Sequence, residues 1–257
     1  MEKITSKNNI IVKDTKKLFT SSRARYENRL FALEGARLCF DVLNSVYELD
    51  TLLFTEDIYA KYQNEINALA KKARRTFMIN EQVSEKLSET KSPQGVFLTV
   101  KMKDDGEIFD SGKIIALDNV QDPANVGAII RSAEALGIDG VVTYKCCDVF
   151  NSKAIRASMG SIFRMNIVDC DDLEQTLAQM KTQNFKVYST VPSSSAVKIT
   201  EVDFTGNAVS VIGNEANGVE ENIKAVSDDL ITIPMLGRAE SLNAGVAAAI
   251  TMWEMLR

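Results

Sequence analysis

The chain has 257 residues, 45% of them apolar, and a formal net charge of −5. This length and composition are typical of an ordinary soluble globular protein with one large domain or two smaller ones. The chain contains no histidine, which excludes Ser-His-Asp and Cys-His catalysis and every metal site that uses histidine.

Neither export nor membrane insertion is expected from the sequence. The N-terminus "MEKITSKNNIIVKD" has no apolar core of a signal peptide, and no stretch approaches the roughly 18 apolar residues of a membrane span. The four cysteines have no C-x-x-C spacing, and the neighbours Cys146 and Cys147 cannot easily form a disulfide with each other. We therefore expect reduced thiols, a cytoplasmic location and no membrane partner.

The first part of the chain, residues 1–105, reads as a compact α/β unit. A helical start over 15–45 leads to a short strand in "LDTLLFT" (49–55), and a helix follows over about 58–73. The segment "SPQGVFLTV" (92–100) predicts a closing strand.

Basic residues concentrate at the front of this unit. Residues 1–37 hold nine basic and four acidic residues, and Arg23, Arg25 and Arg29 lie close together, with "KKARR" (71–75) further on. Such a cluster is compatible with contact to the phosphates of a nucleic acid. A solvated helix face would explain the same residues equally well, so both interpretations stand, with Arg23, Arg25 and Arg29 as the candidate phosphate contacts.

The pattern of predicted helices and strands changes near residue 105. The segment "KMKDDGEIFDSGK" is charged and contains two glycines, so we place a linker at about 102–112 and a second domain at 113–257. Strands and helices then alternate, which predicts a mostly parallel sheet with helices on both faces. The expected strands are 113–120, 140–147, 163–170, 185–192, 207–213 and 229–235; the expected helices begin at Asn125, near Ser152, at Asp171, at Val219 and at Ser241 or Asn243.

Ligands of open parallel sheets bind beyond the carboxyl ends of the strands, so we expect the site in the loops that follow the strands. No G-x-G-x-x-G and no phosphate-loop motif occurs, which disfavours a dinucleotide site. In the first loop, Asn125 is a plausible helix N-cap and Arg131 follows six residues later. Alternatively, Arg131 could form an i,i+3 ion pair with Glu134 on a solvent-exposed helix face.

The second and third loops also carry polar residues after apolar strands. "GNEANG" (213–218) places Glu215 between two glycines, where it could act in a site or merely cap the next helix. In the third loop, Ser241 or Asn243 begins a helix that we expect to be buried. Its apolar stripe comprises Leu242, Val246, Ala249, Ile250, Trp253 and Leu256.

Together the three loops resemble the signature motifs of the SpoU, or TrmH-like, branch of the SPOUT RNA methyltransferases. The matching segments are "NVGAIIR", "IGNEANG" and "IPMLGRAESLNAGVAAAI". In addition, "RLFALEGARLCFDVL" and "TKSPQGVFLTV" are similar to the small substrate-binding domain often fused ahead of the catalytic domain, which itself is similar to certain ribosomal RNA-binding proteins. The resemblance covers nearly the whole chain.

The resemblance implies a fold and a set of site residues. The fold would be a SPOUT α/β domain whose C-terminal segment forms a trefoil knot, an exception to the unknotted rule. S-adenosylmethionine would bind at the knot near Thr190, Gly213, Ile233 and Leu242, with no metal. The catalytic residues would be Asn125, Arg131, Glu215, Ser241 and Asn243.

The implied reaction is methylation of a ribose 2′-hydroxyl by a homodimer. The implied substrate is structured RNA and not DNA, with 23S ribosomal RNA favoured over transfer RNA because the chain stops directly after its final helix. Arg131 would act as an electrostatic stabiliser, since guanidinium is effectively always protonated. A non-catalytic RNA-binding protein and, more remotely, a Rossmann-type oxidoreductase are the alternatives.

Departures from the family pattern are small. Ser161 stands where alanine is frequent, a frequent proline is missing from the strand that follows, and Gly245 stands where serine is common.

Overall fold

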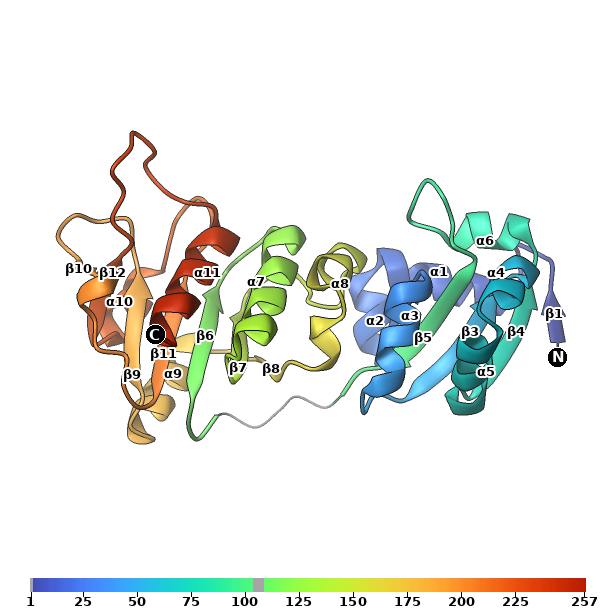
Figure 1. Ribbon diagram of the computed structural model, residues 1–257, viewed down its shortest axis with the longest axis horizontal. Helices are drawn as coiled ribbons and strands as arrows, with labels where there is room; N and C mark the ends of the chain where they lie inside the picture. The colour runs from blue at the N-terminus through green and yellow to red at the C-terminus, as the bar shows by residue number, and fades with distance from the viewer. Residues whose placement is uncertain (1, 104–108) are drawn as a thin grey trace. The chain divides into compact units, whose positions relative to one another are not determined.

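The computed structural model describes residues 2–103 and 109–257 (Figure 1). The chain divides into two compact units: Met1–Asp104 with Phe150–Arg156, and Asp105–Val149 with Ala157–Arg257. Residues 104–108 of the linker predicted at about 102–112 lie outside the described residues. No helix in the described part of the chain is both long and apolar enough to cross a membrane.

The first unit is built around a mixed sheet with the strand order β1-β4-β3-β5-β2. β1, β4 and β3 run parallel to one another, whereas β5 is antiparallel to both of its neighbours. Helices α1 and α6 close a core that includes Phe19, Leu53 and Phe97. The elements are β1 Glu2–Ile4, α1 Ile10–Thr20, α2 Ser22–Asn28, β2 Leu30–Glu34, α3 Ala36–Asp41, β3 Leu49–Phe54, α4 Glu56–Lys61, α5 Gln63–Lys72, β4 Arg75–Ile79, α6 Glu81–Leu87 and β5 Val96–Lys101.

Two predictions for this unit were wrong. The helical start over 15–45 contains β2, because "LFALE" pairs with β5 along its whole length despite the high helix propensity of its leucines, alanine and glutamate. The helix predicted over 58–73 is broken at Tyr62, whose backbone leaves the helical region and separates α4 from α5.

The second unit holds a seven-stranded sheet with the order β10-β12-β9-β11-β6-β7-β8. All of its strand pairs are parallel, as the alternation predicted. This strand order does not describe how the chain is threaded, so the trefoil knot stays a prediction. The elements are β6 Lys113–Asp118, α7 Pro123–Leu136, β7 Gly140–Tyr144, β8 Ile167–Asp169, α9 Leu173–Thr182, β9 Lys186–Thr190, β10 Val197–Lys198, β11 Ala208–Ile212, α10 Glu221–Val226, β12 Asp229–Thr232 and α11 Ala244–Met255. Helix α8, Ser152–Ser158, lies between β7 and β8 in sequence, but most of it belongs to the first unit.

Both faces of this sheet are covered. Ile114 and Ala116 of β6 belong to a buried cluster with residues of α9 and α10, while the alternate residues Ile115 and Leu117 are also fully buried. Because successive side chains of a strand point to opposite faces, the second face needs its own cover. Helices α7 and α11 provide it, packing against each other and against β6, β7 and β11 (Figure 1).

The final helix differs from the prediction of a buried apolar stripe. The buried side of α11 carries small side chains and methionines, and Ala248 and Met252 are inaccessible to solvent. The predicted stripe lies on the other side: Val246, Trp253 and Leu256 are 49%, 61% and 42% exposed. Periodicity identified the stripe correctly, but it could not tell which side of an apolar helix faces the sheet.

Candidate functional site

Three loops meet at the carboxyl edge of the second sheet, and a chain of side-chain hydrogen bonds joins them. Asn125 of α7 donates from Nδ2 to Glu215 Oε1 at 2.9 Å. Asn243, at the start of α11, donates from Nδ2 to Asn125 Oδ1 at 2.9 Å. The residues from the three predicted loops are therefore in direct contact, although they lie 90 and 118 positions apart in sequence.

Asn125 is the centre of this network and not a helix cap, which corrects one prediction. α7 begins at Pro123, and its N-cap is Asp122, whose side chain accepts a hydrogen bond from the N–H of Ala124. Proline suits the first helical position because it lacks an N–H that would be unsatisfied there. Asn125 is 7% exposed, and its buried carboxamide uses a donor and an acceptor to hold two other loops.

Glu215 binds the start of α7 and does not cap the helix that follows it. Its carboxylate accepts hydrogen bonds from the backbone N–H groups of Gln121 and Asp122, both at 3.2 Å. Partial burial raises the pKa of Glu215, but the hydrogen bonds from Asn125, Gln121 and Asp122 outweigh it and hold the pKa below its usual range. Glu215 is consequently an anion at neutral pH, placed at the positive end of a helix dipole.

Asn243 is the N-cap of α11, as one of the two predicted alternatives stated. Its Oδ1 accepts from the N–H groups of Gly245 and Val246, which leaves Nδ2 for Asn125. Ser241 is exposed and lines the cleft described next. Gly245 is one of the departures from the family pattern, and a Cβ added there would lie 3.2 Å from Asn243 Oδ1 and 3.7 Å from the Cβ of Ala128.

A cleft of about 420 Å³ opens beside the network, at the carboxyl ends of β9, β11 and β12. All four predicted cofactor positions line it: Thr190, Gly213, Ile233 and Leu242. A Cβ on Gly213 would lie 2.1 Å from the carbonyl carbon of Gly218, so the turn that forms one wall requires glycine at this position.

The lining of the cleft fits S-adenosylmethionine. Apolar walls that include Ile212, Ile233 and Leu242 suit the adenine ring, while backbone groups and hydroxyls supply polar contacts. Two carboxylates, Glu215 and Glu240, line the cleft beside the single cation Lys224. This balance favours a cationic ligand such as a sulfonium over a dinucleotide with its negative phosphates.

Arg131 lies on the exposed side of α7, outside the cleft of its own chain. Its guanidinium makes no hydrogen bond or ion pair with the part of the chain that the structure describes. The alternative pairing with Glu134 is wrong, since that carboxylate binds Arg164 Nε at 2.9 Å and Ser161 Oγ at 3.1 Å. Ser161, another departure from the family pattern, thus has a structural partner.

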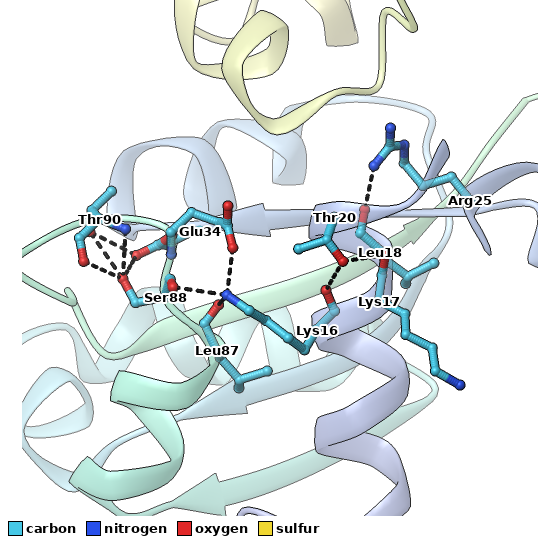
Figure 2. Close-up of polar contacts among 10 residues, drawn as sticks. Lys16, Lys17, Leu18, Thr20, Arg25, Glu34, Leu87, Ser88 and Thr90 are labelled. Atoms are coloured by element: carbon cyan, nitrogen blue, oxygen red, sulfur yellow. Dashed lines mark hydrogen bonds and ion pairs between the residues drawn. The ribbon is translucent and has the colours of Figure 1, made fainter. Parts of the chain in front are cut away.

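The three arginines predicted to contact RNA occupy different environments. Arg23 is highly exposed and forms an i,i+4 ion pair with Glu27, and Arg29 is also exposed while donating to the carbonyl of Lys103. Arg25 is only 2% exposed and donates from Nη1 to the carbonyl of Leu18 at 2.7 Å (Figure 2). This corrects the prediction for Arg25, because a buried guanidinium that holds the end of α1 cannot reach a phosphate.

Sequence reasoning missed several residues that shape the site. Asn214 donates to the carbonyl of Asn119 at 2.8 Å and accepts from two N–H groups of its own turn, so it ties the second loop to the first. Asp118 is fully buried at the end of β6 and accepts from the N–H of Glu220 at 2.7 Å. The available signals were an asparagine in a glycine-flanked turn and a carboxylate that ends an apolar strand.

Comparison with known proteins agrees with this geometry. Residues 112–253 match the SpoU rRNA Methylase family, and residues 9–98 match the MRM3-like substrate binding domain. A 23S rRNA (guanosine(2553)-2'-O)-methyltransferase of Bacillus subtilis (strain 168), RlmP, is 31% identical over 99% of this chain and 99% of its own length.

Solved structures extend the likeness to the whole fold. An AdoMet-bound rRNA methyltransferase from Sinorhizobium meliloti is 28% identical with a TM-score of 0.87, covering 99% of this chain and 97% of that chain. An RNA 2'-O ribose methyltransferase is 26% identical with a TM-score of 0.81, covering 99% and 98%. Since the family match spans over half of the sequence and a relative is similar along its full length, the chain belongs to the SpoU rRNA methylase family and is an RNA methyltransferase.

Proposed function

We propose that this protein transfers a methyl group from S-adenosylmethionine to a ribose 2′-hydroxyl of 23S ribosomal RNA. The observation that carries the proposal is the chain Asn243–Asn125–Glu215, which joins all three loops at the rim of a cleft suited to the cofactor. The name of the Bacillus subtilis relative, similar over its full length, supports 23S rRNA over transfer RNA as the substrate. A ribosomal substrate also favours a cytoplasmic location.

In this proposal the cleft binds the cofactor, and the hydrogen-bond network positions the three loops. S-adenosylmethionine, when bound, supplies a methyl group already activated by its sulfonium charge. Gly213, Ile233 and Leu242 would hold its adenosine part, and Thr190 would lie at the same wall. Asn125, Glu215 and Asn243 would keep the three loops in register, so that the acceptor hydroxyl is held in line with the methyl group. Ser241, at the entrance of α11, would contact the RNA or the cofactor.

Arg131 would stabilise negative charge that develops on the attacking ribose oxygen. The ribose hydroxyl is a very weak acid, and a guanidinium with a pKa above about 12 cannot serve as its base at neutral pH. A fixed cation next to the developing oxyanion lowers the barrier by an amount on the order of 3 kcal/mol. The proton would pass to water or phosphate.

Arg131 would reach a cleft across a dimer interface. On α7 it is flanked by the exposed small residues Ala128 and Ala135, and the neighbouring helix α11 exposes Val246 and Trp253. Exposed apolar side chains on two adjacent helices are typical of a protein contact site. In a symmetric dimer through these helices, each Arg131 would serve the cleft of the partner subunit.

The first unit would bind and orient the RNA. Its match to a substrate-binding domain supports this role, and Arg23 and Arg29 present exposed cations for phosphate contact. A separate leading domain suits a folded target that is read through its shape and backbone.

The reaction and its target can be tested together. Purified protein is incubated with labelled S-adenosylmethionine and either 23S rRNA or transfer RNA from a strain that lacks the gene, and the product is mapped by its resistance to alkaline cleavage. We expect one resistant ribose in 23S rRNA. Label in transfer RNA alone would overturn the choice of substrate, and label on a base would overturn the reaction.

Subunit mixing tests the dimeric site. Arg131→Ala protein is mixed in equal amounts with Gly213→Val protein, which has a blocked cleft, and the dimers are exchanged. If Arg131 acts on the partner's cleft, about a quarter of the wild-type activity returns, because half of the dimers are mixed and each has one intact site. No recovery after verified exchange would contradict action across the interface.

A further inference from the structure

The first unit contains another cleft, which lies where strands β3 and β4 begin. Its volume is about 460 Å³, and its lining includes Lys17, Asp50, Arg74 and Arg75. The two arginines end the basic run "KKARR" and lie at the start of β4. The proposed catalytic mechanism makes no use of them.

Both guanidiniums are anchored on a single buried carboxylate. The side chain of Asp50 is 5% exposed; it accepts from Arg74 Nε at 2.8 Å and from Arg75 Nη2 at 3.1 Å. Hydroxyls of Thr51 and Thr99 also donate to it. Burial raises the pKa of Asp50, but the hydrogen bonds from Thr51, Arg75 and Arg74 outweigh it and hold the pKa below its usual range. Asp50 therefore stays ionised, and one positive charge of the pair is left uncompensated.

The anchored arginines keep part of their hydrogen-bonding capacity for a ligand. Their side chains are 65% and 42% exposed, and their Nη1 atoms make no hydrogen bond within the described residues. A guanidinium has five N–H donors in a rigid fork that matches the oxygens of a phosphate. Fixing the fork in advance reduces the entropy that would be lost on binding.

Among the other charges that line the cleft, Lys17 pairs with Asp14, whereas the carboxylate of Glu27 pairs with Arg23, which does not line the cleft. The charges of the lining residues therefore sum to zero, and the positive groups that remain open to a ligand are the exposed guanidiniums of Arg74 and Arg75. Two further cations, Arg29 and Lys103, flank the same edge of the sheet next to β2 and β5, where they would extend a basic track.

We propose that the cleft at Arg74 and Arg75 binds a phosphate of the RNA backbone, with Asp50 as the residue that positions both guanidiniums. The ligand is the phosphodiester chain of the substrate, and base sequence is not read here. This inference rests on the proposed RNA substrate and adds the surface of the first unit that grips it.

The test measures binding of in-vitro-transcribed, unmodified 23S rRNA to wild type, Arg74→Gln and Arg37→Gln over a range of salt concentrations. Arg37 is a matched control, because it is an exposed arginine of the same unit at the opposite edge of the sheet. Arg74→Gln is expected to weaken binding about tenfold and to lower the salt slope by about 1. Arg37→Gln should bind like wild type.

Two further readouts separate this inference from other failures. Arg74→Lys keeps the cation and should keep the salt slope while losing part of the affinity, which a damaged fold would not reproduce. Affinity for S-adenosylmethionine should be unchanged in every variant, since the cofactor cleft lies in the second unit. If wild type binds and methylates the rRNA but Arg74→Gln binds equally well, or Arg37→Gln loses as much, the assignment is overturned while the proposed function stands.

Discussion

Replacing Asn125 by aspartate should reverse the way in which the stability of the second unit depends on pH. The new carboxylate would stand where the amide nitrogen lies, 2.9 Å from Glu215 Oε1. Two carboxylates at that distance cannot both be ionised without strong repulsion, so the pair shares a proton and its pKa rises.

The magnitude follows from this distance. At an effective dielectric constant of about 20, the repulsion is about 6 kcal/mol, an upper bound because solvent and side-chain rotation reduce it. The charged hydrogen bond that is lost contributes about 2 kcal/mol. If solvent and side-chain rotation reduce the repulsion to about 2 kcal/mol, the two contributions sum to a net loss of roughly 4 kcal/mol near pH 7, which lowers the melting temperature of a unit of this size by roughly 12 °C.

Wild type and Asn125→Asp are expected to differ in the direction in which pH changes their stability. In wild type, the lowered pKa of Glu215 means that its contribution is fully present above its unfolded pKa of about 4.3 and is lost as pH falls below that value. In Asn125→Asp the raised pKa has the opposite effect, so that stability is regained as pH falls by at most about 1.4 kcal/mol per pH unit, and the loss shrinks to roughly 1.5 kcal/mol near pH 5.

The assay is thermal unfolding of wild type, Asn125→Asp and Asn125→Ala between pH 5 and 8. Asn125→Ala removes the same hydrogen bonds without adding a carboxylate, so its difference from wild type should be nearly independent of pH in this range. An Asn125→Asp protein whose deficit is equally large at pH 5 and pH 8 would refute the contact with Glu215.

Three further predictions concern the cleft and the dimer. Arg131→Ala should lower single-turnover methylation by about 10²- to 10³-fold and leave cofactor affinity unchanged, because the proposed role of the side chain is toward the ribose oxygen of the RNA and not toward the cofactor; wild-type turnover would contradict its role. Gly213→Ala should weaken cofactor binding at least about tenfold in calorimetry, because its Cβ would lie 2.1 Å from backbone, whereas Gly237→Ala, with nothing within 4 Å of the new Cβ, should bind normally. Trp253→Lys should give monomers in sedimentation experiments, because a charge would replace a 61% exposed apolar side chain at the proposed interface; an intact dimer would place that interface elsewhere.

The positions that line the cofactor cleft could be predicted from the local sequence pattern. Most residues that line it come from the carboxyl ends of strands or from the loops that follow them, and parallel strands bring those loops to one edge. Strand alternation and motif resemblance were therefore enough to bring Thr190, Gly213, Ile233 and Leu242 to the same cleft. The same reasoning could not say that Asn125 is buried and bonded to both other loops, since the partners of a buried amide depend on packing.

The errors share one physical cause. β2 was read as helix because leucine, alanine and glutamate favour helices locally, and only pairing with β5 makes the segment a strand. Arg25 was read as an exposed cation because charge is visible in sequence and burial is not; its guanidinium is bonded to the carbonyl of Leu18.

The sequence by itself determined the chemistry that the chain can carry: no histidine, an arginine that is always charged, polar residues in three loops after strands, and an apolar final helix. Only the tertiary structure decided which of these groups meet. It buried Asn125 between Glu215 and Asn243, held Arg74 and Arg75 on Asp50, and turned Arg131 and the stripe of Trp253 outward. Periodicity and propensity are properties of neighbouring residues, whereas burial and partner choice depend on contacts between distant ones.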